Sequence, residues 1–139
     1  MTKKIIRYRA GYKYQLADDY QLATSIKPKT DQVLPFVSLD VDGNLSICSG
    51  YAWDGTSGPV IDTDSNMRAS LVHDALYQLM RARKLSRSKY KDKAVRLFRT
   101  ICIEDGVLSP LAGVYYQVLK RLGNPSTDPK NAKDVKRAP

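Results

Sequence analysis

The only histidine of the chain lies directly before an aspartate and four residues before a tyrosine. From Met67 onward the apolar residues recur at the spacing of one helical face, so His73-Asp74-x-x-Tyr77 is predicted on an amphipathic helix. With about 3.6 residues per turn, His73 and Tyr77 share one stripe while Asp74 points about 100° away. An imidazole beside a carboxylate suits proton transfer near neutral pH. The alternative is a half-buried, hydrogen-bonded histidine with a structural role.

A block of basic residues follows this group. Residues 78–99 hold nine Lys and Arg and one acid, Asp92, which gives +8 of the total net charge of +9. Such a block attracts phospholipid headgroups, nucleic acid or an acidic protein surface, and the alternative is a role in solubility alone. The predicted anion-binding residues are Arg81, Arg83, Lys84, Arg87, Lys89, Lys91 and Lys93.

The first fifty residues are expected to form the scaffold. Residues 12–16 and 20–26 alternate between apolar and polar types, which is the period of half-buried strands, with a turn at Asp18-Asp19. Asp42-Gly43 between two further alternating runs predicts a β-hairpin. These patterns together predict a small antiparallel sheet.

A glycine-containing segment, residues 50–59, connects this sheet to the helix. Glycines let the backbone turn with its carbonyls or amides pointing inward, as cation and anion sites require. The alternative is a plain connection with Trp53 in the core. We expect Asp62 or Asp64 to cap the helix.

A second helix is predicted from Ser88 to about Asp105, with Asp92 at the edge of its buried face. An antiparallel helix pair would bring Asp92 towards His73 and Tyr77, and the alternative partner is a neighbouring Lys or Arg. A third helix is expected from Ser109-Pro110 to Gly123. Residues 124–139 lack apolar periodicity and are predicted to form a flexible basic tail.

With 139 residues, the chain fits one α+β domain, residues 1–123, followed by that tail. No apolar run approaches the roughly 20 residues that a membrane span needs, and the N-terminus does not resemble a signal peptide, so synthesis in the cytosol is expected. Cys48 and Cys102 have no second pair for a zinc site and are predicted to be buried thiols.

Two resemblances to known families add to these patterns. Trp53 to Pro59, then Leu71 to Tyr77, Asp92 and Gly123 are similar to a family of small phage and prophage proteins known as domain of unknown function 1353. This resemblance covers most of the chain. It implies a bacteriophage setting, with the protein made in the host cytoplasm and the virion as a possible later location, and it implies no particular activity.

The second resemblance, from the glycine-containing loop to Asp92, is to phospholipase A2, in the compact form of parvovirus minor capsid proteins. It implies that His73 is the base that activates water, that Asp92 orients the other ring nitrogen, and that Tyr77 bonds Asp92. It also implies that Asp74 binds Ca²⁺ with loop carbonyls near Tyr51 and Gly55, and that the ion stabilises the oxyanion.

Two functions follow from these features. The first is a calcium-assisted ester or phospholipid hydrolase that the basic block holds on an anionic surface. The second is a non-catalytic virion component (tail, neck or capsid accessory) or assembly component. In that case His73, Asp74 and Asp92 form a buried polar network, and the basic block and tail bind capsid, tail or DNA neighbours. A homo-oligomer is compatible with either function. A hydrolase requires His73 to face an open cleft, whereas a scaffold would bury all three side chains.

Overall fold

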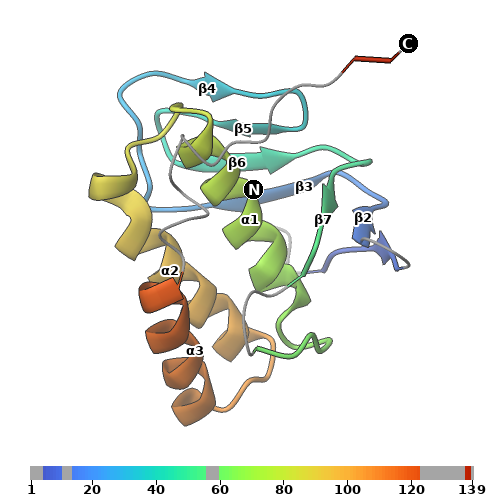
Figure 1. Ribbon diagram of the computed structural model, residues 1–139, viewed down its shortest axis with the longest axis vertical. Helices are drawn as coiled ribbons and strands as arrows, with labels where there is room; N and C mark the ends of the chain where they lie inside the picture. The colour runs from blue at the N-terminus through green and yellow to red at the C-terminus, as the bar shows by residue number, and fades with distance from the viewer. Residues whose placement is uncertain (1–4, 11–13, 56–59, 123–136, 139) are drawn as a thin grey trace.

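The computed structural model describes residues 5–10, 14–55, 60–122 and 137–138. Within these residues short strands come first and helices follow (Figure 1). The strands are β1 (Tyr8–Arg9), β2 (Tyr14–Leu16), β3 (Tyr20–Ala23), β4 (Gln32–Val33), β5 (Val37–Leu39), β6 (Asn44–Ile47) and β7 (Ala52–Trp53). The helices are α1 (Met67–Arg81), α2 (Arg87–Glu104) and α3 (Ser109–Leu122). The predicted α+β class is confirmed.

The larger sheet has the strand order β3-β6-β5-β4, and all of its neighbouring strands are antiparallel. Its centre is the predicted hairpin, in which Leu39 of β5 lies opposite Leu45 of β6. The turn requires glycine because Gly43 has a φ of +86° and a Cβ there would lie 2.2 Å from the carbonyl oxygen of Thr24. The hairpin prediction is confirmed, and β4 adds an outer strand that the sequence pattern did not predict.

The smaller sheet has the order β1-β2-β7, so β2 and β3 lie in different sheets although they are neighbours in the sequence. The sequence pattern predicts a loop at β7, but Ala52 and Trp53 pair with Gln15 and Tyr14 of β2. Trp53 is buried, and its indole nitrogen donates a hydrogen bond of 2.9 Å to the hydroxyl oxygen of Ser70. The smaller sheet is therefore fastened to α1 by a buried hydrogen bond.

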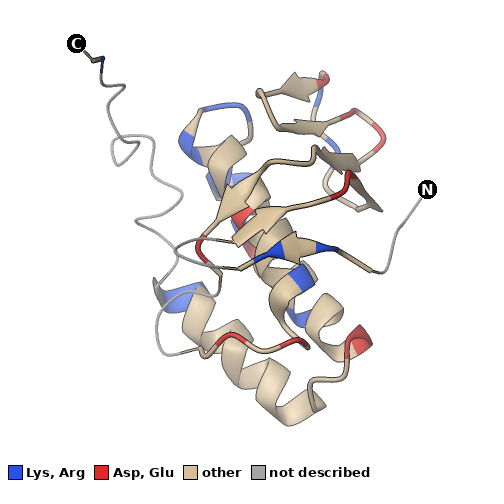
Figure 2. Cartoon of the chain, turned by 90° about the vertical axis from the view of Figure 1, so that its right-hand side faces the viewer, with Lys and Arg blue, Asp and Glu red and all other residues tan. Residues whose placement is uncertain are grey.

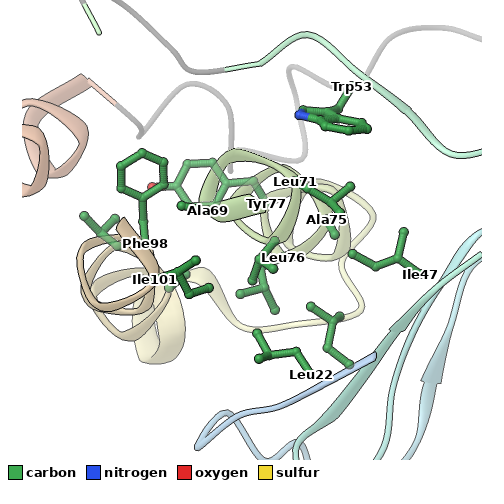
Figure 3. Close-up of a cluster of buried hydrophobic side chains, with 14 of the residues drawn as sticks. Leu22, Ile47, Trp53, Ala69, Leu71, Ala75, Leu76, Tyr77, Phe98 and Ile101 are labelled. Carbon is green, nitrogen blue, oxygen red and sulfur yellow. The ribbon is translucent and has the colours of Figure 1, made fainter. Parts of the chain in front are cut away.

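Helix α1 crosses the middle of the molecule (Figure 1). Of its 15 residues all but Asp74, Gln78 and Arg81 are buried, and these three share one stripe because they are four and three residues apart. The side chains that surround the helix come from the larger sheet and from α2, among them Leu22, Ile47, Phe98 and Ile101 (Figure 3). The predicted chemical group thus lies on the most buried helix.

The start of α1 differs from the prediction. Asn66 precedes the helix, makes no capping hydrogen bond with its side chain, and instead bonds the backbone of the preceding loop. Asp62 accepts a hydrogen bond of 2.8 Å from the hydroxyl of Tyr14 on β2. The expectation that Asp62 or Asp64 caps the helix is therefore wrong, because Asp62 fastens the loop to the smaller sheet.

The other two helices form close to their predicted bounds. Helix α2 runs antiparallel to α1 and begins after Ser86, whose hydroxyl oxygen accepts a hydrogen bond from the backbone of Lys89 (Figure 1). Helix α3 packs against α2 and begins at the predicted Ser109. No helix of the described residues has the length and apolar character that a membrane span needs. The predicted tail at 124–139 lies outside the described residues, apart from 137 and 138.

The two cysteines differ in burial. Cys102 is buried in α2, as predicted, and burial raises the pKa of its thiol to about 12. Cys48 is exposed directly after β6, so the prediction of a buried thiol is wrong at that position. The sheet ends one residue earlier, which leaves this side chain outside the core.

Candidate functional site

The histidine lies between α1 and α2. His73 is only 4% exposed, its ring centroid is 3.8 Å from that of Tyr77, and it meets the edge of Phe98 on α2 at 5.6 Å. We call His73, Tyr77 and Phe98 the histidine cluster. Tyr77 and Phe98 lie at the contact between the two helices (Figure 3). The predicted stripe of His73 and Tyr77 therefore exists, but it faces the second helix.

Two polar atoms in this cluster are buried without a hydrogen bond among the described residues: Nε2 of His73 and the hydroxyl of Tyr77. Burial, followed by the charge of Asp74, raises the pKa of Tyr77, so its phenol stays protonated. Buried polar atoms are nearly always paired, and an unpaired one costs about 1–3 kcal/mol. The cluster is therefore not the fully satisfied network that a structural role requires.

Asp74 lies at the edge of the cluster. Its side chain is 24% exposed, and Oδ1 is 3.6 Å from Nδ1 of His73, which is longer than a hydrogen bond. Burial raises the pKa of Asp74 and the neighbouring His73 opposes that rise, while the charge of Arg81 lowers this pKa and the charge of Asp54 raises it. Asp54, Asp74 and Arg81 thus form a mixed group of charges beside the buried histidine.

Asp92 does not join this group. One of its carboxylate oxygens accepts a hydrogen bond of 2.6 Å from the hydroxyl of Tyr116 on α3, and the other accepts one of 2.6 Å from Nε of Arg96. Both hydrogen bonds lower the pKa of Asp92, and the one from Tyr116 has the larger effect. The predicted bonds from Asp92 to His73 and Tyr77 are therefore wrong, and the alternative of a basic neighbour is correct. The reason is that α2 packs against two helices, and α3, which carries Tyr116, lies on the side of α2 that Asp92 faces.

The donors expected for calcium are Asp74 and the backbone carbonyls near Tyr51 and Gly55. The carbonyl oxygen of Tyr51 accepts a hydrogen bond of 2.8 Å from the backbone of Leu16, so it points into the smaller sheet. At Gly55, where φ is +93°, a Cβ would lie 2.4 Å from a carboxylate oxygen of Asp62, so this turn lies against the side chain of Asp62. No three His, Cys, Asp or Glu residues of the described chain gather as metal ligands. Ca²⁺ takes about 6–8 oxygen ligands, so calcium binding by Asp74 and the loop stays a prediction. Residues 56–59 of the predicted loop lie outside the described residues.

The predicted anion-binding residues lie along the connection from α1 to α2 and the first turns of α2 (Figure 2). We call them the basic surface: Arg81, Arg83, Lys84, Arg87, Lys89, Lys91 and Lys93. Arg83, Lys84, Arg87, Lys89 and Lys93 are exposed, and the other two are half-buried. The ammonium groups of Lys89 and Lys93 lie 5.2 and 6.0 Å from the ring centre of Tyr90, which the first turns of α2 carry. Five of the seven residues are therefore exposed, on the connection and on more than one side of the first turns of α2.

One buried charge was not predicted from the sequence. Arg68, in the first turn of α1, is 2% exposed and donates hydrogen bonds to Asp105 (3.0 and 2.9 Å), Glu104 (2.8 Å) and the hydroxyl of Tyr20 (3.0 Å). It thereby links α1 to the end of α2 and to β3. A cavity of about 340 Å³ borders Arg68 and Asp105, with apolar walls that include Ile6. In the sequence, the signal for this buried charge is a single arginine on an otherwise apolar helical face, together with two adjacent acids at the end of the next helix.

Comparisons with protein-family models, with curated proteins and with solved structures find no match to this chain. The resemblances to the phage family and to phospholipase A2 therefore stay predictions. The basic surface and the histidine cluster are the two features of the fold that bear on function.

Proposed function

We propose that this protein binds an anionic partner through the basic surface, as both functions expected from the sequence require. The observation that carries this proposal is the concentration of exposed Lys and Arg on one connection and one helix, with Asp92 as the only acid among residues 78–99. The charge of that carboxylate is paired with Arg96, and Tyr116 donates a hydrogen bond to it. The basic surface therefore presents a large excess of positive charge to a partner.

The backbone at Arg83 supports a role beyond solubility. Arg83 has a φ of +60°, the left-handed conformation that favours glycine, and the bond from the Lys84 amide to the Leu79 carbonyl (2.9 Å) closes the end of α1 around it. A non-glycine residue in this conformation costs about 1 kcal/mol. An exposed arginine that is present although it lowers the stability of the fold is typical of a functional position.

The test compares Arg83→Gly with Arg9→Gln, which removes an exposed charge from β1 in the smaller sheet. Arg83→Gly should raise the free energy of unfolding by about 0.5–1 kcal/mol and weaken binding to heparin or duplex DNA by about fivefold. Arg9→Gln should change the affinity less. Binding of the parent should fall steeply with salt. Equal losses of affinity in the two variants would contradict the proposal, because charge anywhere on the protein would then suffice.

In the bacteriophage setting that the resemblance implies, the partner would be nucleic acid, a membrane or an acidic virion protein. Each of these presents repeated negative charge, and each gives salt-dependent binding. The choice among them needs a feature other than charge.

A second candidate function, ester hydrolysis, is favoured by the unpaired Nε2 of His73 and hydroxyl of Tyr77. In this function Nε2 of His73 would take a proton from the attacking water, with Asp74 facing the other ring nitrogen. Water must reach a side chain that is 4% exposed, so α1 and α2 would have to separate locally. His73→Gln should abolish release of fatty acid from phospholipid vesicles, while Asp92→Asn should retain it, since Asp92 bonds Tyr116. No hydrolysis by the parent protein would remove this candidate.

A further inference from the structure

The segment between β3 and β4 adds two cations beside the start of α2 (Figure 1). The hydroxyl of Tyr90 on α2 donates a hydrogen bond of 2.9 Å to the backbone carbonyl oxygen of Lys27, across 63 residues of sequence. Pro28 favours an extended backbone at Lys27. Since Pro28 is buried while Lys27 and Lys29 are exposed, both lysine side chains lie on the outer side of this segment. The segment therefore extends the positive charge of α2 towards the larger sheet.

Tyr90 also lies next to two lysines of its own helix. Lys89 and Lys93 are one helical turn apart, and both ammonium groups lie within cation–π range of the ring. The acids nearest to these lysines in the sequence have other partners, since Asp31 bonds a backbone amide and Asp92 pairs with an arginine. We call the four exposed lysines around Tyr90 the lysine patch: Lys27, Lys29, Lys89 and Lys93.

We propose that the lysine patch binds the phosphate backbone of double-stranded nucleic acid. Lysines that neutralise the phosphates of a duplex release its condensed counterions, which favours binding at any base sequence. Phosphate contacts of this kind hold a protein on the duplex, whereas recognition of the base edges needs further contacts in the grooves. The inference rests on the proposed function, since it names the anionic partner of a surface that includes Lys89 and Lys93.

The aromatic side chains of this region argue against a single strand as the partner. Proteins bind single strands by stacking the bases on aromatic rings, in addition to neutralising phosphates. Tyr90 is only 6% exposed, and its ring lies next to Lys89 and Lys93. Phe36 is the only aromatic residue among the exposed large hydrophobic residues of the described chain, and it lies in the turn between β4 and β5, against Gly50. The lysine patch therefore offers cations but no stacking surface.

The apolar side chains argue in the same way against a bilayer. Strong interfacial binding to a membrane requires an apolar face that enters the acyl boundary, and cations add to it. Within residues 24–31 and 81–97 no large hydrophobic side chain is exposed. Protein interfaces, in turn, are enriched in aromatic residues and arginine and depleted in lysine. A duplex needs only cations at its phosphates, so it is the anionic partner that the lysine patch fits best.

The experiment measures fluorescence anisotropy of labelled DNA of about 20 nucleotides per strand, as a duplex and as a single strand, with the full chain. We expect the duplex to bind more tightly, because its charges are about twice as dense along the axis. Lys27→Gln with Lys29→Gln keeps the backbone bond from Tyr90. This variant should weaken duplex binding by about tenfold and reduce the slope of log K against log salt by about 2. The matched control, Arg9→Gln with Arg99→Gln, removes the same charge from exposed positions of β1 and α2 and should change both quantities less.

Binding to other polyanions separates this inference from the proposed function. Heparin binding without duplex binding would overturn the inference and leave the proposed function standing. Tighter binding to the single strand would overturn it in favour of base stacking, and binding to phosphatidylglycerol vesicles without duplex binding would do so in favour of lipid. Equal losses of duplex affinity in the variant and its control would also overturn it, because the lysine patch would then have no special part. Absence of binding to heparin, duplex and vesicles would refute the proposed function itself.

Discussion

Replacement of Arg68 by methionine tests whether the buried charge holds the fold together. Methionine keeps most of the apolar volume of the side chain, so packing changes little, but Asp105 and Glu104 lose their cation. The side chain of Arg68 is 3% exposed, that of Asp105 is 19% exposed and that of Glu104 is 47% exposed. The two acids can therefore recover part of their hydration, and Asp105 recovers less than Glu104.

These exposures set the size of the effect. Removal of one partner from a buried ion pair costs about 3–5 kcal/mol, and the partial exposure of Asp105 places this case near about 3 kcal/mol. The lost bond to the Tyr20 hydroxyl adds about 1 kcal/mol. An unfolding entropy of about 2.1 cal/mol/K per residue converts a total of about 3–4 kcal/mol into a decrease in Tm of roughly 10–14 °C.

The assay is thermal unfolding followed by circular dichroism, with Arg96→Met as the matched control. Arg96 pairs with Asp92 where the two side chains are 67% and 50% exposed, so this control should cost less than about 1 kcal/mol. Addition of Asp105→Asn to Arg68→Met should recover part of the lost stability, because the uncompensated charge disappears. A decrease in Tm as small as that of Arg96→Met would refute the reasoning.

Three other expected outcomes follow from the described contacts. Burial raises the pKa of Asp74, so the folded state binds this proton more tightly than the unfolded chain does, and ionisation above the folded pKa costs stability. Asp74→Asn should therefore be more stable than the parent at pH 8 but not near pH 4, as urea unfolding at both pH values would show. Gly55→Ala should lose about 2 kcal/mol in the same assay, because of its φ of +93° and the carboxylate of Asp62. A thiol reagent should modify Cys48 in the native protein and Cys102 only after unfolding.

The sequence predicts those parts of the fold that depend on local signals. The Asp42-Gly43 hairpin and the three helices carry turn residues, caps and a helical period within a single window. Strands β1 and β7 are two residues long, which is too short for any period, and only pairing with β2 defines them. The position of β3 in a different sheet from β2 likewise depends on distant partners.

The site shows the same limit. The period of α1 correctly places His73 and Tyr77 on one stripe. Five of the seven predicted anion-binding residues are exposed, and their binding of anions stays a prediction. The predicted orientation of Asp92 towards His73 is wrong, because it depends on whether α1 or α3 lies on the side of α2 that Asp92 faces. Arg68 was missed because its partners lie 36 and 37 residues away, where no window of sequence connects them.

The return of β7 to β2 has a consequence for synthesis of the chain. Tyr14 pairs with Trp53, so one edge of β2 has no partner until the residues between them have left the ribosome. At about 5–20 residues per second this interval lasts roughly 2–8 s. An open strand edge during that time is a template for pairing with another chain. Nascent chains truncated before residue 52 should therefore aggregate more readily than chains that extend through α1. The order in which the strands are translated thus affects how this protein avoids aggregation while it folds.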